Sequence, residues 1–445
     1  MSLLAEGKLA NVEEELQLPI AEISNDPSVT IHLTPEKLFA RHCAILGSTG
    51  GGKSYTMANL INNVKKYGGK VLLLDATGEY ENLPCESYYV GENPHANDQN
   101  KVTYPHWMFT DSDIRALLRP SAGSQAPKLE EAIRSLKVVT CYWNLQNHNL
   151  RITSDYNLEK SEQLKQPFEK AINDIKSDFA TIPWNFSSLA SQIVAECVWP
   201  NSGTSTNPDL TKWGKRSEND VGYCLSLISR IKAIQNNHHL KWMLDCDTSL
   251  KQIPNIIDNL CSNKQSSLIR LDLSFVPFEA NAREILVNTI GRKLLDCARK
   301  SNISYENPLL VFIDESHQFL NKSIGDEISK MNLTAFGDIA KEGRKYGLNI
   351  VMATQRPRDI PEDVLSQIGT LIVHRLTNEK DQEIVKKAVG SIDNRSASFL
   401  PVLGQGEALL LGVDFPFPMK VKIKQPESPP QSRSASFSKA WNYEK

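Results

Sequence analysis

The sequence predicts an α/β protein with a mainly parallel sheet and a helical insertion. An apolar strand at 43–46 leads through a Gly-rich loop into a helical stretch at 55–68, and a second apolar strand follows at 70–75. This order is typical of the start of a parallel α/β sheet. Strand patterns then return at 267–274 and 308–315, after a long helical stretch.

The helical stretch has its own periodicity and is broken by polar segments such as 201–220. The Pro/Ser-rich end of the chain has the composition of an extended or disordered tail. We therefore predict an N-terminal segment at 1–40, a first core part at 41–110, a mainly helical insertion at 111–262, a second core part at 263–424 and the tail at 425–445.

Composition indicates a soluble globular protein, since 40% of the 445 residues are hydrophobic and 23% are charged. The chain has no apolar run long enough for a transmembrane helix, and its acidic start does not resemble a secretory signal. The eight cysteines include no CxxC pair, so neither a zinc site nor a disulfide scaffold is indicated. We expect a cytoplasmic protein with reduced thiols and no membrane partner.

The net charge of −2 neither supports nor opposes nucleic-acid binding. It gives no support to a surface that is basic all over, yet a local basic stripe or a pore lined by a few Lys and Arg residues is compatible with it.

The loop GSTGGGKS at 47–54 fits the pattern G-x-x-x-x-G-K-[ST]. Its glycines let backbone N–H groups point at phosphate oxygens, and the helix that follows adds its positive N-terminal end. Lys53 should reach the β- and γ-phosphates of ATP, and the Ser54 hydroxyl should bind Mg²⁺. The expected nucleotide-binding residues are Gly47, Ser48, Thr49, Gly50, Gly51, Gly52, Lys53, Ser54 and Tyr55.

The strand at 308–315 ends in two acidic residues at the edge where parallel α/β sheets place ligands. Asp314 can hold Mg²⁺ through water, and Glu315 is placed to polarise an attacking water. The pair therefore predicts ATP hydrolysis rather than nucleotide binding alone.

A third strand at 348–355 ends in Gln355, which could hydrogen-bond the γ-phosphate or the attacking water. Arg344, Arg356 and Arg375 are candidate phosphate-sensing arginines, because a planar guanidinium stabilises charge during phosphoryl transfer. For each of them a surface salt bridge is an equally good interpretation.

Five other polar positions have simpler interpretations. His238 and His239 lie in a helical stretch with no partner at a metal-ligand spacing, which favours a solvated face. His317 is expected to pack or to orient its neighbours rather than to catalyse. Asp75 and Asp272 each end a strand, so they lie near the site or cap a following helix.

Taken together and in order, these motifs resemble the HerA/FtsK branch of P-loop ATPases, and HerA in particular. The resemblance extends over residues 40–415, most of the chain. Its matching pieces are 41–56, 72–80, 124–133, 309–320, 342–357, 364–378 and 381–382.

The resemblance implies a RecA-like core that assembles as a hexameric ring, with ATP between neighbouring subunits and double-stranded DNA driven through the central channel. Arg344 and Arg375 match positions that include the arginine supplied by the next subunit, and which of them acts stays open. HerA proteins typically work with a nuclease, often NurA, in end resection. Bacterial relatives pair with sirtuin-like or nuclease effectors in anti-phage defence. The ATP-site positions matched in this chain are Lys53, Ser54, Asp314, Glu315 and Gln355.

The chain departs from the family at its start. Relatives usually carry an N-terminal β-barrel of roughly a hundred residues, more than the 46 residues that precede Gly47 can build. We expect a shortened, reduced or absent barrel.

Two other functions fit the same motifs. A related ring ATPase could move protein, although the lack of a transmembrane segment counts against it. A nucleotide-gated hexameric scaffold could instead assemble and activate a partner effector with little DNA movement, and the short N-terminus and ordinary net charge keep this alternative open.

Overall fold

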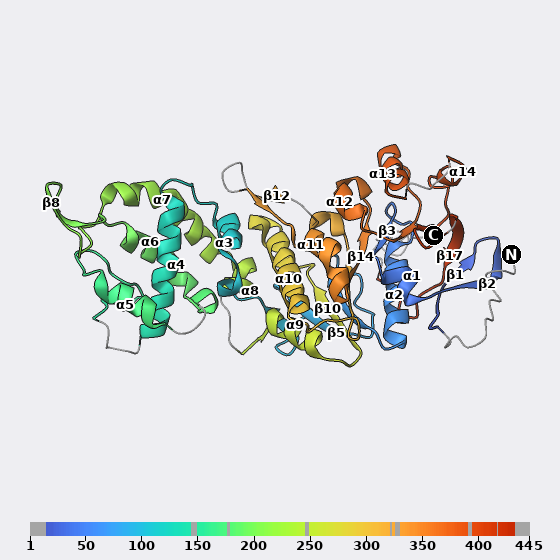
Figure 1. The fold of residues 1–445 in the computed structure, drawn as a ribbon, viewed down its shortest axis with the longest axis horizontal. Helices are drawn as coiled ribbons and strands as arrows, with labels where there is room; N and C mark the ends of the chain where they lie inside the picture. The colour runs from blue at the N-terminus through green and yellow to red at the C-terminus, as the bar shows by residue number, and fades with distance from the viewer. Residues whose placement is uncertain are drawn as a thin grey trace, which may run out of the picture.

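The computed structural model describes residues 15–143, 149–175, 179–244, 249–320, 323–324, 330–389, 394–415 and 417–431. Figure 1 shows an elongated molecule with a cluster of helices at one end and a sheet flanked by helices over the rest. No helix within these ranges is long and apolar enough to cross a membrane.

One 13-stranded sheet runs through the described chain. The neighbours from β15 to β9 pair in parallel, while β16, β17, β1 and β2 extend one edge with antiparallel pairs. The predicted mainly parallel α/β sheet is therefore confirmed. The strand order is β2 (Asp26–Leu33), β1 (Leu18–Ile23), β17 (Met419–Ile423), β16 (Glu407–Gly412), β15 (Thr370–Val373), β3 (Cys43–Leu46), β14 (Leu348–Thr354), β11 (Leu309–Ile313), β4 (Lys70–Asp75), β10 (Ser267–Asp272), β5 (Glu86–Val90), β6 (Lys101–Thr103) and β9 (Lys251–Gln252).

Alternate side chains of the central strands enter two separate hydrophobic cores, because successive residues of a strand point to opposite faces. On β4, Leu72 and Leu74 join the core on one face, while Val71 and Leu73 join the core on the other. The first face is covered by α9 (Ile253–Ser262), α10 (Ala282–Arg299), α11 (Ala335–Glu342) and α12 (Glu362–Leu365), and the second by α1 (Pro35–Phe39) and α2 (Lys53–Lys66).

Helix α2 matters most for the site because its first turn carries the phosphate-loop lysine. Its buried residues include Met57, Leu60, Ile61 and Val64, whose spacing of three and four residues forms one apolar helix face. Burying each such side chain contributes about 1.5–3 kcal/mol relative to leaving it in water. The helix ends before Gly68, whose φ of +82° suits glycine.

The helical lobe at the end of the molecule is narrower than the predicted insertion at 111–262. It contains α4 (Gln125–Tyr142), α5 (Gln166–Asp174), α6 (Leu189–Glu196), α7 (Glu218–Gln235) and the hairpin of β7 (Ser202–Thr204) and β8 (Asn207–Asp209). The two ends of the predicted insertion, α3 (Asp111–Leu118) and α9, contact α10, and β9 pairs with β6 in the sheet. Those ends therefore contribute to the core.

The described part of the predicted N-terminal segment extends the core sheet. Strand β1 pairs with β17 near the other end of the chain, so that Ala21 lies opposite Ile423. Because this pairing joins segments at opposite ends of the sequence, the local pattern at 1–40 did not reveal it.

The described part of the predicted tail, 425–431, follows β17 along α2 to the loop after β4. Asn59 Nδ2 donates to the carbonyl of Lys424 at 3.0 Å, and the N–H of Gln431 donates to the carbonyl of Glu79 at 2.7 Å. Residues 432–445 of that tail lie outside the described residues.

Candidate nucleotide-binding site

The glycine-rich loop connects the carboxyl end of β3 to the start of α2 and is anchored by its neighbours. The N–H of Gly47 donates to the carbonyl of Thr354 at 3.3 Å, and the N–H of Ser48 donates to the carbonyl of Arg375 at 2.8 Å. Gly52, just before the helix, has a φ of +123°, a conformation that only glycine adopts readily. Strands β14 and β15 therefore hold the loop from its two sides.

His374 forms the floor of this loop, a role that the sequence analysis did not assign. A Cβ added to Gly47 would lie 2.6 Å from the His374 Cβ, and one added to Gly52 would lie 3.0 Å from Cε1. The ring contacts Thr56 Oγ1 through Nε2 at 2.7 Å and the carbonyl of Glu407 through Nδ1 at 2.8 Å. Since a carbonyl only accepts, Nδ1 carries the proton and Nε2 accepts from the hydroxyl of Thr56.

The neutral state of His374 makes the stability of the protein depend on pH. Burial lowers the pKa of His374 from 6.5 to about 4, and the positive charge of Lys53 adds to this while the Glu407 carbonyl opposes it. Between these two pKa values the unfolded chain binds the proton and the folded chain does not, so stability is lost as the pH falls. Replacing His374 with Gln should make the loss of unfolding free energy between pH 7 and pH 5 smaller by about 2 kcal/mol.

Urea unfolding of both proteins at the two pH values measures this difference. The exposed residue His32 provides a matched His-to-Gln substitution away from the phosphate loop. Equal pH dependence in the parent and the His374→Gln variant would rule out a neutral buried His374.

Lys53 is buried at the start of α2, and its Nζ donates to the carbonyl of Ser48 at 3.3 Å. Burial lowers the pKa of Lys53, while the negative charges of Glu315, Asp314 and Glu79 oppose that shift. Three carboxylates therefore surround Lys53, the lysine that would bind the phosphates of the nucleotide.

Glu79 is a site residue that the sequence analysis missed, although its segment was among the matching pieces. Burial raises the pKa of Glu79, and a hydrogen bond from Ser54 opposes the shift. The loop that carries Glu79 is organised by Asp75, whose carboxylate accepts from the N–H groups of Gly78 at 2.7 Å and Tyr80 at 3.2 Å. Asp75 therefore caps a loop rather than a helix.

Asp314 lies directly after β11 and is buried. Its carboxylate accepts from Thr77 Oγ1 at 2.9 Å. Burial raises the pKa of Asp314 well above its ordinary value, and the nearby negative charges of Asp75 and Glu315 add to the shift. A cation at this position would offset the cost of keeping so many carboxylates together.

Glu315 is held in an unusual backbone conformation, with a φ of +46°. A residue other than glycine in this left-handed region costs about 1 kcal/mol or more, and such strain clusters at functional sites. The ring of His317 lies against it, with Nδ1 at 3.2 Å from Glu315 Oε2, and also reaches Thr354 Oγ1 at 3.3 Å. His317 thus packs beside Glu315, whose Oε2 is buried and has no hydrogen-bond partner among the described residues.

Gln355 extends from the end of β14 to the exposed tip of the phosphate loop. The hydroxyl of Thr49 donates to Gln355 Oε1 at 2.6 Å. The three strands β3, β11 and β14 therefore place the loop, the acidic pair and Gln355 together at the edge of the sheet formed by the carboxyl ends of the parallel strands.

The candidate arginines lie in different places. Arg375 follows β15 at the same edge as the phosphate loop, and its side chain is exposed. Arg344 lies before β14, so the length of that strand, about 20 Å, separates it from the site of its own chain. Arg356 forms an exposed ion pair with Asp359 at 3.8 Å, as the salt-bridge interpretation expects.

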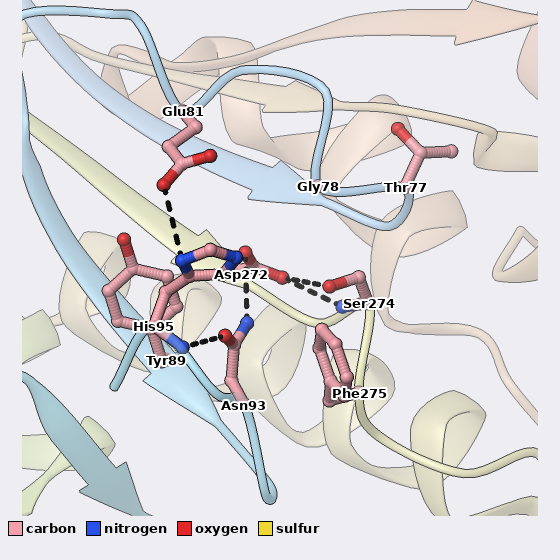
Figure 2. Close-up of a pocket in the computed structure, with 9 residues that line it drawn as sticks. All are labelled: Thr77, Gly78, Glu81, Tyr89, Asn93, His95, Asp272, Ser274 and Phe275. Carbon is pink, nitrogen blue, oxygen red and sulfur yellow. Dashed lines mark hydrogen bonds and ion pairs between the residues drawn. The ribbon is translucent and has the colours of Figure 1, made fainter. Parts of the chain in front are cut away.

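A polar cavity of about 210 Å³ adjoins the site beyond β4. Figure 2 shows the carboxylates of Glu81 and Asp272 at this cavity, together with His95 and Phe275, and Thr77 at its border. Asp272 also accepts from the N–H of Ser274 at 2.9 Å, so it caps a turn rather than a helix. No residue of the phosphate loop lines this cavity, so it is distinct from the phosphate cradle.

Two family models match the chain almost end to end. The model described as "Helicase HerA, central domain" matches residues 18–294, and the one described as "Helicase HerA-like C-terminal" matches residues 304–441. The chain belongs to the HerA family. The resemblance drawn from the ordered motifs is confirmed.

Two curated members of the HerA family show what share of a relative's length this chain covers. A DNA double-strand break repair helicase HerA of Saccharolobus solfataricus is 25% identical over 391 residues, which cover 86% of this chain and 64% of that protein. Its counterpart in Pyrococcus furiosus is 25% identical over 430 residues, covering 89% and 67%. The chain thus spans less than two thirds of the length of the first of these helicases.

Solved structures confirm the RecA-like fold. VirB4 of Thermoanaerobacter pseudethanolicus matches with a TM-score of 0.56 and 14% identity, over 93% of this chain and 97% of that one. The plasmid coupling protein TrwB, in a complex with ADP and Mg²⁺, matches with a TM-score of 0.52 and 13% identity, over 95% and 92%. At this identity the match establishes the fold alone.

Proposed function

We propose that this HerA-family chain hydrolyses ATP and uses the energy to move along, or to unwind, double-stranded DNA. The observation that carries the proposal is the convergence of Lys53, the Asp314–Glu315 pair and Gln355 at one edge of the sheet. Relatives of similar sequence are named DNA double-strand break repair helicases.

The phosphate loop has free donors for a nucleotide. Within the described chain, the N–H groups of Gly50, Gly52 and Lys53 have no backbone acceptor, although the loop around them is firmly anchored. Together with the N-terminal end of α2, these donors suit the anionic oxygens of a triphosphate. Lys53 would then exchange its bond to the Ser48 carbonyl for one to the phosphates.

Ser54 and Asp314 are the residues that would hold Mg²⁺. Their oxygens are the ligands that this ion prefers, and the raised pKa of Asp314 marks a place where positive charge is needed. When bound, Mg²⁺ supplies neutralisation of the charge on the phosphates. Glu79, which accepts from Ser54, would keep that hydroxyl aimed at the ion.

Glu315 would act as the base that orients and polarises the attacking water. Its strained backbone holds the carboxylate before substrate arrives, which is the preorganisation that catalysis rewards, and its buried Oε2 has no hydrogen-bond partner among the described residues, which leaves that oxygen available to a water. Gln355 would sense the γ-phosphate, because a change in its hydrogen bond to Thr49 would shift the end of β14, which Gln355 directly follows.

The arginines support assembly into a ring. Arg344 is exposed at the sheet edge opposite its own phosphate loop, and no carboxylate pairs with it in the described ranges. A second copy is therefore what could bring this guanidinium to a nucleotide. Arg375, at the near edge, is the alternative donor.

The finer parts of the proposal come from the family resemblance. We propose a hexamer in the cytoplasm that works with a NurA-like nuclease, or with a sirtuin-like or other effector in anti-phage defence. Identifying what copurifies with the native protein would test this part independently of ATP hydrolysis.

The test of the central proposal measures ATP turnover with and without linear duplex DNA. We expect duplex DNA to increase turnover severalfold and ATP to drive displacement of a strand or a block from the duplex. Lys53→Ala should abolish both activities, because the charge of the phosphates is left uncompensated. ATP turnover that ignores DNA would contradict the motor, and effector assembly that survives Glu315→Gln would favour the nucleotide-gated scaffold.

A further inference from the structure

We propose that Glu92, His238 and His239 form a binding site for a divalent transition-metal ion of the Zn²⁺ type. One carboxylate oxygen and one ring nitrogen from each histidine lie within 4.8 Å of one another, and all three side chains are exposed. The sequence offers the two histidines no partner at a metal-ligand spacing. The fold supplies one from a distant loop.

Each part of the cluster is positioned by contacts of its own. Glu92 follows β5 through Gly91, which has a φ of +84° and passes so close to Phe275 that a Cβ there would lie 2.8 Å from the Phe275 carbonyl. This close approach fixes where the loop turns outward. A larger residue than glycine would displace the carboxylate from the cluster.

The two histidines lie in the short helix η6 (His238–Leu240). The side chain of Asn237 accepts from the N–H of His239 at 3.0 Å and donates to Glu279 Oε2 at 2.8 Å. The imidazole rings stand side by side, with centroids 3.9 Å apart. Asn237 therefore sets both the start of the helix and its attachment to the neighbouring segment.

The donor set selects the type of ion. Two imidazole nitrogens and one carboxylate oxygen suit Zn²⁺ and similar ions, whereas Mg²⁺ and Ca²⁺ prefer oxygen ligands alone. Three protein ligands leave a fourth tetrahedral position for water. No other described residue forms a hydrogen bond or ion pair with these three side chains, so binding would break no existing contact.

The position of the cluster gives the ion a structural role. Glu92 belongs to the loop after a strand of the core sheet, while His238 and His239 follow α7 of the helical lobe. An ion held by all three would link the lobe to the core. Asn93 and His95, just after Glu92 in the sequence, line the polar cavity beside the nucleotide site, so the loop that carries Glu92 also borders that cavity.

Titration of the full-length chain with Zn²⁺ tests the site, using protein without a polyhistidine tag and with excess Mg²⁺ to occupy oxygen-only sites. We expect one ion per chain to bind the parent protein. Glu92→Gln and the double variant His238→Gln/His239→Gln should each weaken binding at least ~10-fold, because the loss of a direct ligand weakens binding no less than the loss of a group that only orients a ligand. The control His32→Gln, an exposed histidine elsewhere, should bind like the parent.

Thermal unfolding provides the second measurement. Without metal, all variants should unfold at the parent temperature, because the three side chains are exposed. Zn²⁺ should raise the unfolding temperature of the parent and of His32→Gln but not of the cluster variants. Binding that is equally tight in all four proteins, or no stoichiometric binding to the parent, would overturn the proposal.

Discussion

Replacing Glu315 with Gln is expected to lower the maximal rate of ATP hydrolysis by at least ~10²-fold, and as much as ~10⁴-fold, because a positioned base contributes about that much. The amide has the shape of the carboxylate but cannot take a proton from water. Nucleotide binding should persist, since the phosphate loop and Lys53 are unchanged. Steady-state turnover and binding of a fluorescent ATP analogue measure the two effects separately.

A matched control is the exposed residue Glu306 at the opposite edge of the sheet, before β11. Glu306→Gln should leave both turnover and binding unchanged. If Glu315→Gln turns over ATP like this control, another group must act as the base. A loss of binding in Glu315→Gln would instead point to a structural role for the side chain.

Replacing Arg270 with Met is expected to reduce the free energy of unfolding by roughly 3–5 kcal/mol, because two buried carboxylates lose their partner. Arg270 is fully buried; its Nε donates to Asp75 at 2.7 Å, and a terminal nitrogen donates to Asp272 at 2.8 Å. Burial lowers the pKa of Arg270, but the two aspartates outweigh this and raise it. Urea denaturation measures the loss.

Two further variants separate charge from packing. Arg151→Met removes an exposed ion pair with Glu159 and should cost no more than ~1 kcal/mol. Adding Asp75→Asn and Asp272→Asn to Arg270→Met should recover part of the stability, because no unpaired charge then remains buried. An Arg270→Met variant as stable as Arg151→Met would contradict the buried network.

This network also bears on function, because Asp75 organises the loop that carries Thr77 and Glu79. Thr77 contacts Asp314, and Glu79 accepts from Ser54. Weakening the network should therefore disturb the candidate Mg²⁺ ligands from the side opposite to the phosphate loop.

Much of the fold could be predicted because its signals are local. The strand, glycine-rich loop and helix at 43–66 occupy one continuous stretch of sequence. Each of these elements is indicated by the pattern of polar and apolar side chains over a few neighbouring residues. The apolar strands that end at Asp314 and Gln355 are likewise readable alone. Parallel strands present their carboxyl ends at one edge, so these residues could be expected to meet.

Other contacts depended on the strand order, which periodicity does not encode. The hairpin at 18–33 pairs with β17, and Glu79, although its segment was recognised, gained a role only through its contact with Ser54. His374 could have been noted as a polar residue ending an apolar strand. Nothing in its neighbours, however, indicated that its ring would support three glycines of the phosphate loop.

The sequence by itself determined which residues can cradle phosphate and polarise water, because those groups are spaced along short continuous motifs. Only the tertiary structure decided which residues from elsewhere in the chain lie near them. Arg375 lies beside the phosphate loop, whereas Arg344 lies a strand's length away from it. Glu92 lies close to His238 and His239 at the junction of the helical lobe and the core. The physical reason is that contacts between residues distant in the sequence depend on the order of the strands in the sheet. That order results from the burial of apolar side chains along the whole chain.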